Sequence, residues 1–338
     1  MTAIARVVFL CLLAAAASCS GALVEECTRG ELDQRYCDRD GDLVADPSPE
    51  HLRLDPDVLV FAYTPVEDPA QFRGVWAPFL QHLEGLVGRE VLFFPVQSNA
   101  AQIEAMRAGR LHVAGFNTGS VPLAVNCAGF RPLAMMARAD GSFGYEMELL
   151  THRDSDIESV QDLRGRSLAF TSPTSNSGFK APSVLLEAEF GLVAEEDFDA
   201  VFSGRHDNSI LGVLQRDYEA AAVANQVIDQ VLARGVGSRD ELRVLYRSVS
   251  FPTTAYGVSN RLEPTIAAAV GEAHELVGVI AVAAVGVVEA EQAVAVKGRL
   301  RDEDVPDQRV LVDVRSPAVW RCVVSADECV VGVREVVE

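Results

Sequence analysis

The sequence predicts an α/β protein in two units, and three observations support this. From residue 58 onward, short apolar runs alternate with amphipathic segments, which is the pattern of parallel strands joined by helices. A second stretch of the same style begins near residue 155. The composition, 49% hydrophobic and 23% charged over 338 residues, is that of a globular chain with one or two domains and an ample core.

The first unit has a regular succession of elements. Short runs rich in β-branched and aromatic residues predict strands, which we place at 59–63, 90–96, 111–116, 133–137 and 145–151. Longer segments with one polar face predict helices at 70–86 and 100–108. A hairpin-like turn at 139–142 separates the last two strands.

A hydroxyl-rich turn is the most informative part of the second unit. A strand at 167–170 leads into Thr171–Ser177, where six of the seven residues are Ser, Thr or Asn, and a helix follows at about 179–190. These side chains are hydrogen-bond donors, Gly178 lets a ligand approach the backbone, and a helix start presents unpaired N–H groups at a positive dipole end. A plain helix cap would need only one such residue. The turn therefore predicts an anion site that needs no lysine.

A second polar turn, at 201–208, ends another strand and enters a helix at 209–216. A lone histidine is usually structural, but His206 would lie beside a helix start with its ring ready to donate to an oxyanion. A short strand at 217–222 and a helix from Asn225 complete the unit.

Net charge and motif content narrow the function classes. Subtracting 49 Asp and Glu from 29 Lys and Arg gives −20, which argues against a nucleic-acid partner because phosphate backbones require a cationic surface. The sequence contains no His-Glu-x-x-His pair, no Gly-x-Ser-x-Gly elbow and no phosphate loop ending in Gly-Lys-Ser/Thr. We therefore expect no enzyme and no required cofactor; a hydrolase with His206 as base and Ser177 as nucleophile is the catalytic alternative.

The N-terminal residues are typical of an export signal. Arg6 precedes an apolar run at 7–17, which is too short to span a bilayer as a mature helix. The run closes on Ala16-Ala17-Ser18-Cys19, which resembles a bacterial lipobox. We expect a lipoprotein signal at 1–18, lipidation of Cys19 and a periplasmic protein anchored to a bacterial membrane; an ordinary cleavable signal is the alternative.

Export to an oxidising compartment changes how the remaining cysteines are interpreted. Cys27 with Cys37, and Cys322 with Cys329, are plausible local disulfide pairs. Cys127 lies in an apolar stretch and is expected to be a buried small hydrophobe rather than a nucleophile.

Residues 19–56 are expected to be an acidic linker that includes a calcium-loop pattern. The carboxylates at relative positions one, three, five and nine are Asp38, Asp40, Asp42 and Asp46. Glycine stands at position four instead of six, and position twelve is Pro49. A weak Ca²⁺ site and a merely acidic tether both remain open, because Asp, Gly and Pro suit a solvated tether equally well.

The region 277–338 departs from the pattern of both units, because it is rich in valine and lacks the amphipathic helices expected to cover the first unit. Three explanations stay open: strands of an unrelated addition, a poorly folded tail, or a shifted reading frame. The coding DNA would test the last.

Six short motifs occur in order: Ala62-Tyr63-Thr64-Pro65 with Asp68-Pro69, the run 103–110, Asp140-Gly141 with Gly144-Tyr145, Asp162-Leu163-Arg164-Gly165, Ser175-Asn176-Ser177-Gly178, and Phe202-Ser203-Gly204-Arg205-His206-Asp207. Single pieces are weak signals, but six in register are strong. Together they resemble the phosphonate/phosphite/phosphate substrate-binding proteins of ABC importers over roughly residues 59–262.

The resemblance implies a two-lobed periplasmic binding protein fold (venus-flytrap) in which two interlobe crossover strands join α/β lobes that close on ligand. Lobe 1 would comprise 57–147 and 249–276, and lobe 2 would comprise 148–248. The hinge would lie near Glu148 and Val249.

The same resemblance assigns residues to the ligand. The Ser-Thr-Ser seat of the family falls on Ser175, Asn176 and Ser177, where asparagine still leaves a donor. The tyrosine and histidine of the cleft fall on Tyr145 and His206.

In the first lobe, a family tyrosine is replaced around Ser98 and Asn99, which removes an aromatic wall and favours a small tetrahedral oxyanion. Thr64 and the loop 117–120, which includes Thr118, are the expected first-lobe donors. Asp207 or Glu219 would accept from a phosphate hydroxyl or pair with a ligand amine, unless they are only a helix cap and an exposed strand residue.

The implied function is the solute-binding component of an ABC importer, a monomer that captures phosphate, phosphite or a phosphonate and delivers it to a permease and ATPase complex. Which oxyanion it binds stays open. A ligand sensor for a membrane kinase is the alternative, and neighbouring genes would discriminate between the two.

Overall fold

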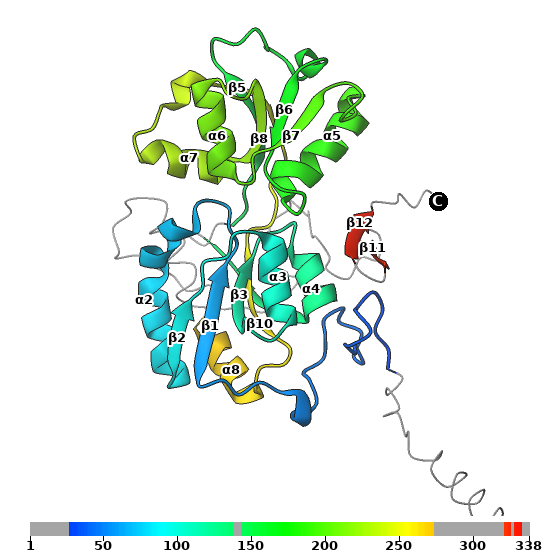
Figure 1. Ribbon diagram of the computed structural model, residues 1–338, viewed down its shortest axis with the longest axis vertical. Coiled ribbons are helices and arrows are strands. Elements are labelled where there is room, and N and C mark those ends of the chain that lie inside the picture. Colours follow the sequence, from blue (N-terminus) through cyan, green and yellow to red (C-terminus); the bar gives the residue numbers. More distant parts are fainter. Residues whose placement is uncertain (1–26, 138–142, 274–320, 326–327, 333–338) are drawn as a thin grey trace, which may run out of the picture.

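The computed structural model describes residues 27–137, 143–273, 321–325 and 328–332. It contains two lobes, one above the other in Figure 1, and each lobe has a five-stranded mixed sheet with helices against it. The two-lobed α/β fold predicted from the sequence is thus confirmed. The signal segment with Cys19 and the turn at 139–142 lie outside the described residues.

The sheet of the first lobe has the strand order β2-β1-β3-β10-β4. β1 runs parallel to β2 and β3, and β10 runs antiparallel to β3 and β4. The strands are β1 (Val58–Tyr63), β2 (Glu90–Phe93), β3 (Val113–Phe116), β4 (Phe130–Met135) and β10 (Ala255–Ser259). The helices are α2 (Pro69–Val87), α3 (Asn99–Arg107), α4 (Val121–Ala128) and α8 (Pro264–Glu272).

The sheet of the second lobe has the order β7-β6-β8-β5-β9, with β6 parallel to β7 and β8. The strands are β5 (Met147–His152), β6 (Ser167–Phe170), β7 (Asp199–Phe202), β8 (Ala220–Ala224) and β9 (Leu242–Arg247). The helices are η3 (Asn176–Lys180), which continues into α5 (Ala181–Phe190), then α6 (His206–Gln215) and α7 (Asn225–Ala233). Short helical turns are η1 (Glu50–Leu52), η2 (Val160–Leu163) and η4 (Arg239–Glu241).

Each lobe has its own apolar core. In the first, an aromatic cluster joins the sheet to α2, with ring centroids of Phe61 and Trp76 4.8 Å apart and those of Phe79 and Tyr256 5.6 Å apart. In the second, alternate residues of β5 and β6 pack against Leu186 of α5. Because each core is closed within one lobe, the interface between the lobes is left to polar turns.

The two chain segments that cross between the lobes are hydrogen-bonded to each other. The backbone N–H of Tyr145 donates to the carbonyl of Phe251 at 3.0 Å, and the N–H of Phe251 donates back at 2.7 Å. Val249, which is 71% exposed, lies in the second crossing. Glu148, near which the sequence analysis places the hinge, is a fully buried carboxylate inside β5, just after the first crossing at Tyr145.

Residues 27–56 are not a free linker. Leu32, Tyr36 and Ala45 are buried in the core formed with α3 and α4, and the N–H of Ser48 donates to the carbonyl of Asn260 at 2.9 Å. The expected disulfide between Cys27 and Cys37 is present. The apolar residues in this acidic segment explain why it packs against the first lobe instead of extending into solvent.

At the C-terminal end, β11 (Arg321–Ser325) and β12 (Glu328–Gly332) form a two-stranded antiparallel sheet. The pairing of Cys322 with Cys329 stays a prediction. Cys127, expected to be buried, is half-buried. Among the described residues, no helix combines the length and apolarity needed to cross a membrane.

Candidate oxyanion-binding site

The site lies where parallel strands of both lobes end. Thr64 follows β1 and Asn117 follows β3, while Thr171 follows β6 and Asn225 follows β8. Ligands of open α/β sheets bind at the carboxyl ends of the strands, where the following helices begin. The turns of the two lobes contact each other directly here, and Figure 1 shows α3 and α4 below the start of α5.

Ser175 organises the start of the helix formed by η3 and α5. Its Oγ accepts a hydrogen bond from the N–H of Gly178 at 3.0 Å, which caps the helix, and lies 3.3 Å from Nε2 of His206. Gly178 is required because a Cβ there would lie 1.9 Å from Oγ1 of Thr171. Glycine is therefore needed at position 178 so that Thr171 of the same turn can pack against the helix start.

The hydrogen bonds around His206 assign its tautomer. Nδ1 accepts from the backbone N–H of Ala224 at 3.1 Å, so the proton of the neutral ring is on Nε2, which points at Ser175. Burial lowers the pKa of His206 to about 4, so the ring is uncharged at neutral pH. The oxygen of Ser175 therefore accepts from both Gly178 and His206, and its own O–H remains a donor for a third group.

Tyr145 brings a second group of donors together. Its hydroxyl accepts a hydrogen bond from Nδ2 of Asn176 at 3.3 Å and also interacts with the side chains of Thr118 and Ser177. Burial raises the pKa of the Tyr145 phenol, so this hydroxyl keeps its proton. Oγ1 of Thr118, from the first lobe, donates to the carbonyl of Pro252 at 2.6 Å.

The polar side chains of the first lobe form a network of hydrogen bonds that reaches the second lobe. Oγ1 of Thr64 donates to Oδ1 of Asn99 at 2.8 Å and accepts from Nδ2 of Asn117 at 2.9 Å. Nδ2 of Asn99 then donates across the interface to Oγ1 of Thr174 at 2.8 Å. Ser98 takes another role: it is exposed, and its Oγ caps α3 by accepting from the N–H of Ala101 at 3.1 Å.

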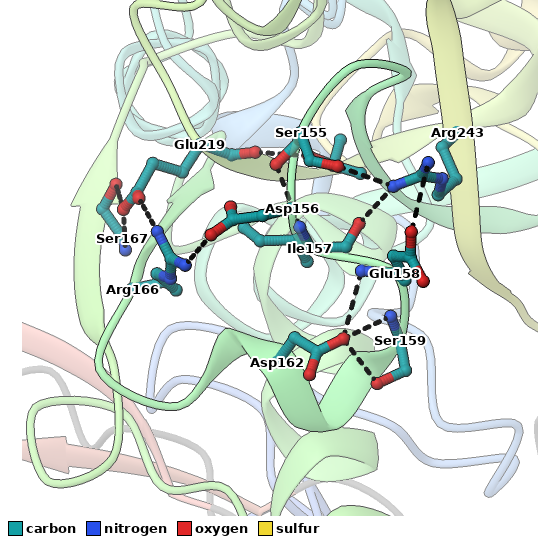
Figure 2. A network of polar contacts seen from close by, with 11 residues as sticks. Ser155, Asp156, Ile157, Glu158, Ser159, Asp162, Arg166, Ser167, Glu219 and Arg243 are labelled. Atoms are coloured by element: carbon teal, nitrogen blue, oxygen red, sulfur yellow. Dashed lines mark hydrogen bonds and ion pairs between the residues drawn. The ribbon is translucent and has the colours of Figure 1, made fainter.

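The two candidate hydrogen-bond acceptors, Asp207 and Glu219, lie in different parts of the second lobe. Asp207 is buried, and its Oδ2 accepts from the backbone N–H of Asp68 in the other lobe at 3.1 Å. Glu219 accepts from the N–H of Ser167 at 2.8 Å and pairs with Arg166 at 3.1 Å in the network of Figure 2. Since Ser167 begins β6 and the seat follows the end of β6, Glu219 lies at the wrong end of the sheet to accept from a ligand.

Two further residues meet at the interface: Gly119, which the sequence analysis includes only as part of the loop 117–120, and Lys180, which it does not single out. Nζ of Lys180, at the end of η3, donates to the carbonyl of Gly119 in the other lobe at 2.6 Å. Burial lowers the pKa of Lys180 to about 8. A signal was present in the sequence, since Lys180 and Lys297 are its only lysines.

The carboxylates of the calcium-loop pattern are partly gathered. Oxygens of Asp38, Asp40 and Asp42 lie within 4.8 Å of one another, whereas Asp46 pairs with Arg39 at 2.9 Å. Both oxygens of Asp38 accept backbone N–H groups of its own loop, from Asp42 and Leu43, at 3.0 and 3.1 Å. Calcium binding stays a prediction.

Two α/β lobes with paired crossings and donors from both lobes at the interface define a two-lobed solute-binding protein. Residues 61–275 match the family described as "ABC transporter, phosphonate, periplasmic substrate-binding protein". The chain belongs to that family, as the motifs predicted.

Two relatives carry names that fit this assignment. The chain is 28% identical over 209 residues to the phosphonates-binding periplasmic protein of Escherichia coli, covering 61% of this chain and 62% of that one. It is 27% identical to the phosphate-import protein PhnD of Mycolicibacterium smegmatis over 62% of this chain and 69% of that one.

Two solved structures share the fold. One is a binding protein component of an ABC phosphonate transporter from Pseudomonas aeruginosa, with a TM-score of 0.57 at 20% identity over 64% of this chain and 74% of that one. The other is PhnD1 from Prochlorococcus marinus in complex with methylphosphonate, with a TM-score of 0.56 at 19% identity over 65% of this chain and 84% of that one.

Proposed function

We propose that this chain is the solute-binding component of an ABC importer and that it captures a small phosphorus oxyanion, namely phosphate, phosphite or a phosphonate, between its lobes for delivery to a membrane permease. Family membership supports the transport role, and the names of the two relatives point to phosphonate and phosphate as ligands. The observation that carries the proposal is the Ser175 hydroxyl, which caps a helix and is aligned by a neutral histidine.

The chemistry of the site suits an anion. The donors we assign to the ligand are the side chains of Ser175, Ser177, Asn176 and Tyr145, together with the second amide hydrogen of Asn99 from the first lobe. His206 acts through Ser175, and the hydroxyls of Thr64 and Thr118 already donate to Asn99 and to the carbonyl of Pro252. Hydrogen bonds from neutral groups to an anion are short and strong, and the N–H groups at the start of η3 add a positive dipole end. The site can therefore hold a dehydrated oxyanion although the whole chain carries a charge of −20.

The geometry favours binding over hydrolysis. A base that activates a serine needs a free nitrogen facing it, but Nδ1 of His206 accepts from Ala224, so the nitrogen facing Ser175 carries the proton. No carboxylate bonds to Nδ1 to orient it as in a catalytic triad, because a backbone N–H takes that position. We infer a non-enzymatic monomer, exported and tethered to the membrane through Cys19.

Calorimetric titration tests the proposal. Wild-type protein freed of ligand is titrated with phosphate, phosphite and methylphosphonate, and at least one should bind. Ser175→Ala and Ser177→Ala should each weaken that ligand by about 1–3 kcal/mol, or about 5- to 150-fold in Kd. Ser155→Ala, in the remote network of Figure 2, is the matched control and should leave the affinity unchanged. Unaltered affinity in both seat variants, or no binding of any of the three ligands, would reject the proposal.

A further inference from the structure

We propose that Gly119 and Lys180 limit the size of the ligand, so that the site favours phosphate, phosphite and methylphosphonate over phosphonates that carry a longer chain. This inference rests on the proposed function and deepens it, since it names which of the phosphorus oxyanions fit.

Gly119 allows the lobes to meet at backbone distance beside the seat. A Cβ at this position would lie 2.4 Å from the carbonyl oxygen of Thr174 and 2.6 Å from the backbone nitrogen of Asn176, both in the other lobe. These atoms belong to the backbone, so they cannot move aside as a flexible side chain would. Any larger residue would hold the lobes apart next to Ser175.

Lys180 stabilises the same contact between the two lobes. Its Nζ donates to the carbonyl of Gly119 at 2.6 Å, and the bond joins the end of η3 to the loop that begins α4. A hydrogen bond from an ammonium group is stronger than one between neutral groups. The loop of the first lobe is therefore held down on the turn that carries Ser175 and Asn176.

Further interlobe contacts surround the seat. On the Thr174 side, Asn99 donates to that residue at 2.8 Å. On the His206 side, the N–H of His206 donates to the carbonyl of Val66 at 3.2 Å, and Asp207 accepts from Asp68.

A third contact on the His206 side is the ion pair between Glu67 of the first lobe and Arg234 of the second. The seat residues are correspondingly buried, with Ser177 only 2% and Ser175 only 5% exposed.

This arrangement has a consequence for the ligand. The oxygens of an oxyanion can use the donors of Ser175, Ser177 and Tyr145, but a chain projecting from phosphorus meets contacts of the closed lobes around the seat. Admitting that chain requires the lobes to separate, which breaks the Lys180 bond and the contacts beside it. A hydrogen, a hydroxyl or a methyl group on phosphorus is smaller, and we expect it to require less separation of the lobes.

Titration with ligands of graded size tests the size limit. The probes are inorganic phosphate, phosphite, methylphosphonate and 2-aminoethylphosphonate. We expect wild-type protein to bind its preferred small oxyanion on the order of 100-fold more tightly than 2-aminoethylphosphonate, which corresponds to the loss of several closed-state contacts.

Two variants should reduce this selectivity. Gly119→Ala adds the Cβ that props the lobes apart, and Lys180→Met keeps the length of the side chain but removes the ammonium group. Each should lower the affinity for the small oxyanion about tenfold or more while changing that for 2-aminoethylphosphonate less, so that the ratio narrows. Gly85→Ala, whose Cβ meets nothing within 4 Å, is the matched control and should keep the wild-type ratio.

The outcomes separate the two proposals. If wild-type protein binds no phosphorus oxyanion, the proposed function is wrong and the size limit falls with it. If it binds phosphate or methylphosphonate but takes 2-aminoethylphosphonate equally tightly, only the size limit is overturned. An unchanged affinity ratio in both variants would also overturn the size limit. Thermal unfolding without ligand shows whether Gly119→Ala is folded. If that variant does not fold, Lys180→Met alone tests the size limit.

Discussion

Lowering the pH from 7 to 5 is expected to destabilise this protein through His206. The imidazole is buried next to the Ser175 hydroxyl, and its Nδ1 already accepts a hydrogen bond from the N–H of Ala224. A second proton would have to displace that bond inside the protein. Burial accordingly lowers the pKa of His206 from 6.5 to about 4.

The sign and size of the effect follow from proton linkage. Between pH 6.5 and about 4, the unfolded chain binds a proton at His206 that the folded chain does not. The free energy of unfolding therefore falls as the pH falls through this window, and the loss levels off below about pH 4. With these two pKa values, the contribution lost between pH 7 and pH 5 is about 2 kcal/mol.

Urea unfolding at pH 7, 6 and 5 measures this contribution. His206→Asn removes the titrating ring, and His51→Asn, at an exposed histidine, is the matched control. Other groups also titrate in this range, so the informative quantity is the difference between wild type and variant at each pH. We expect that difference to shrink by about 2 kcal/mol between pH 7 and 5 for His206→Asn and to stay constant for the control. A constant difference for His206→Asn would refute a neutral, buried His206.

Three further predictions concern features outside the seat. Replacing Cys27 and Cys37 by serine should lower the free energy of unfolding by about 3 kcal/mol, the loop-closure value for their separation of 10 residues, and an unchanged urea midpoint would contradict this. If the acidic loop binds Ca²⁺, calorimetry should detect a weak site with a Kd of about 10⁻⁴ to 10⁻³ M that Asp40→Asn abolishes; no heat in millimolar Ca²⁺ would exclude it. Glu148→Gln should cost about 1–2 kcal/mol of stability, because the buried carboxylate pairs with Arg239 at 2.7 Å, yet ligand affinity should stay within about twofold; a large loss of affinity would contradict this purely structural role.

Much of the secondary structure followed from local patterns. The strand predicted at 167–170 coincides with β6, and the helix predicted at 70–86 differs from α2 by one residue at each end. Some boundaries differ by three residues, as at α6, which begins at His206 instead of residue 209, and α4 was not predicted. Hydrophobic periodicity marks where an element runs, but its first turn depends on capping contacts, and here the N–H of His206 bonds to Val66 of the other lobe.

The sequence located some residues of the candidate site but not others. Ser175, Asn176, Ser177 and Tyr145 are brought together as expected, because three of them share one turn at a helix start. Glu219, the other candidate acceptor, lies at the opposite end of the sheet, where it accepts from the N–H of Ser167.

The linker prediction differs from the structure over residues 27–56, for a related reason. Its many charged and turn-forming residues masked a few apolar ones, such as Tyr36, that bury against α3 and α4. Composition reports the average character of a segment, whereas docking depends on the few side chains that face the neighbouring surface.

The sequence by itself determined the α/β alternation, the family and the donor-rich turn, because strand periodicity, helix capping and turn chemistry act between residues that are close along the chain. Only the tertiary structure decided the tautomer of His206, the bond from Lys180 to Gly119 and the backbone contact that closes the seat. These depend on how near two separately folded lobes approach each other, and that distance is set by packing between residues some sixty positions apart, as in the pair Gly119 and Lys180.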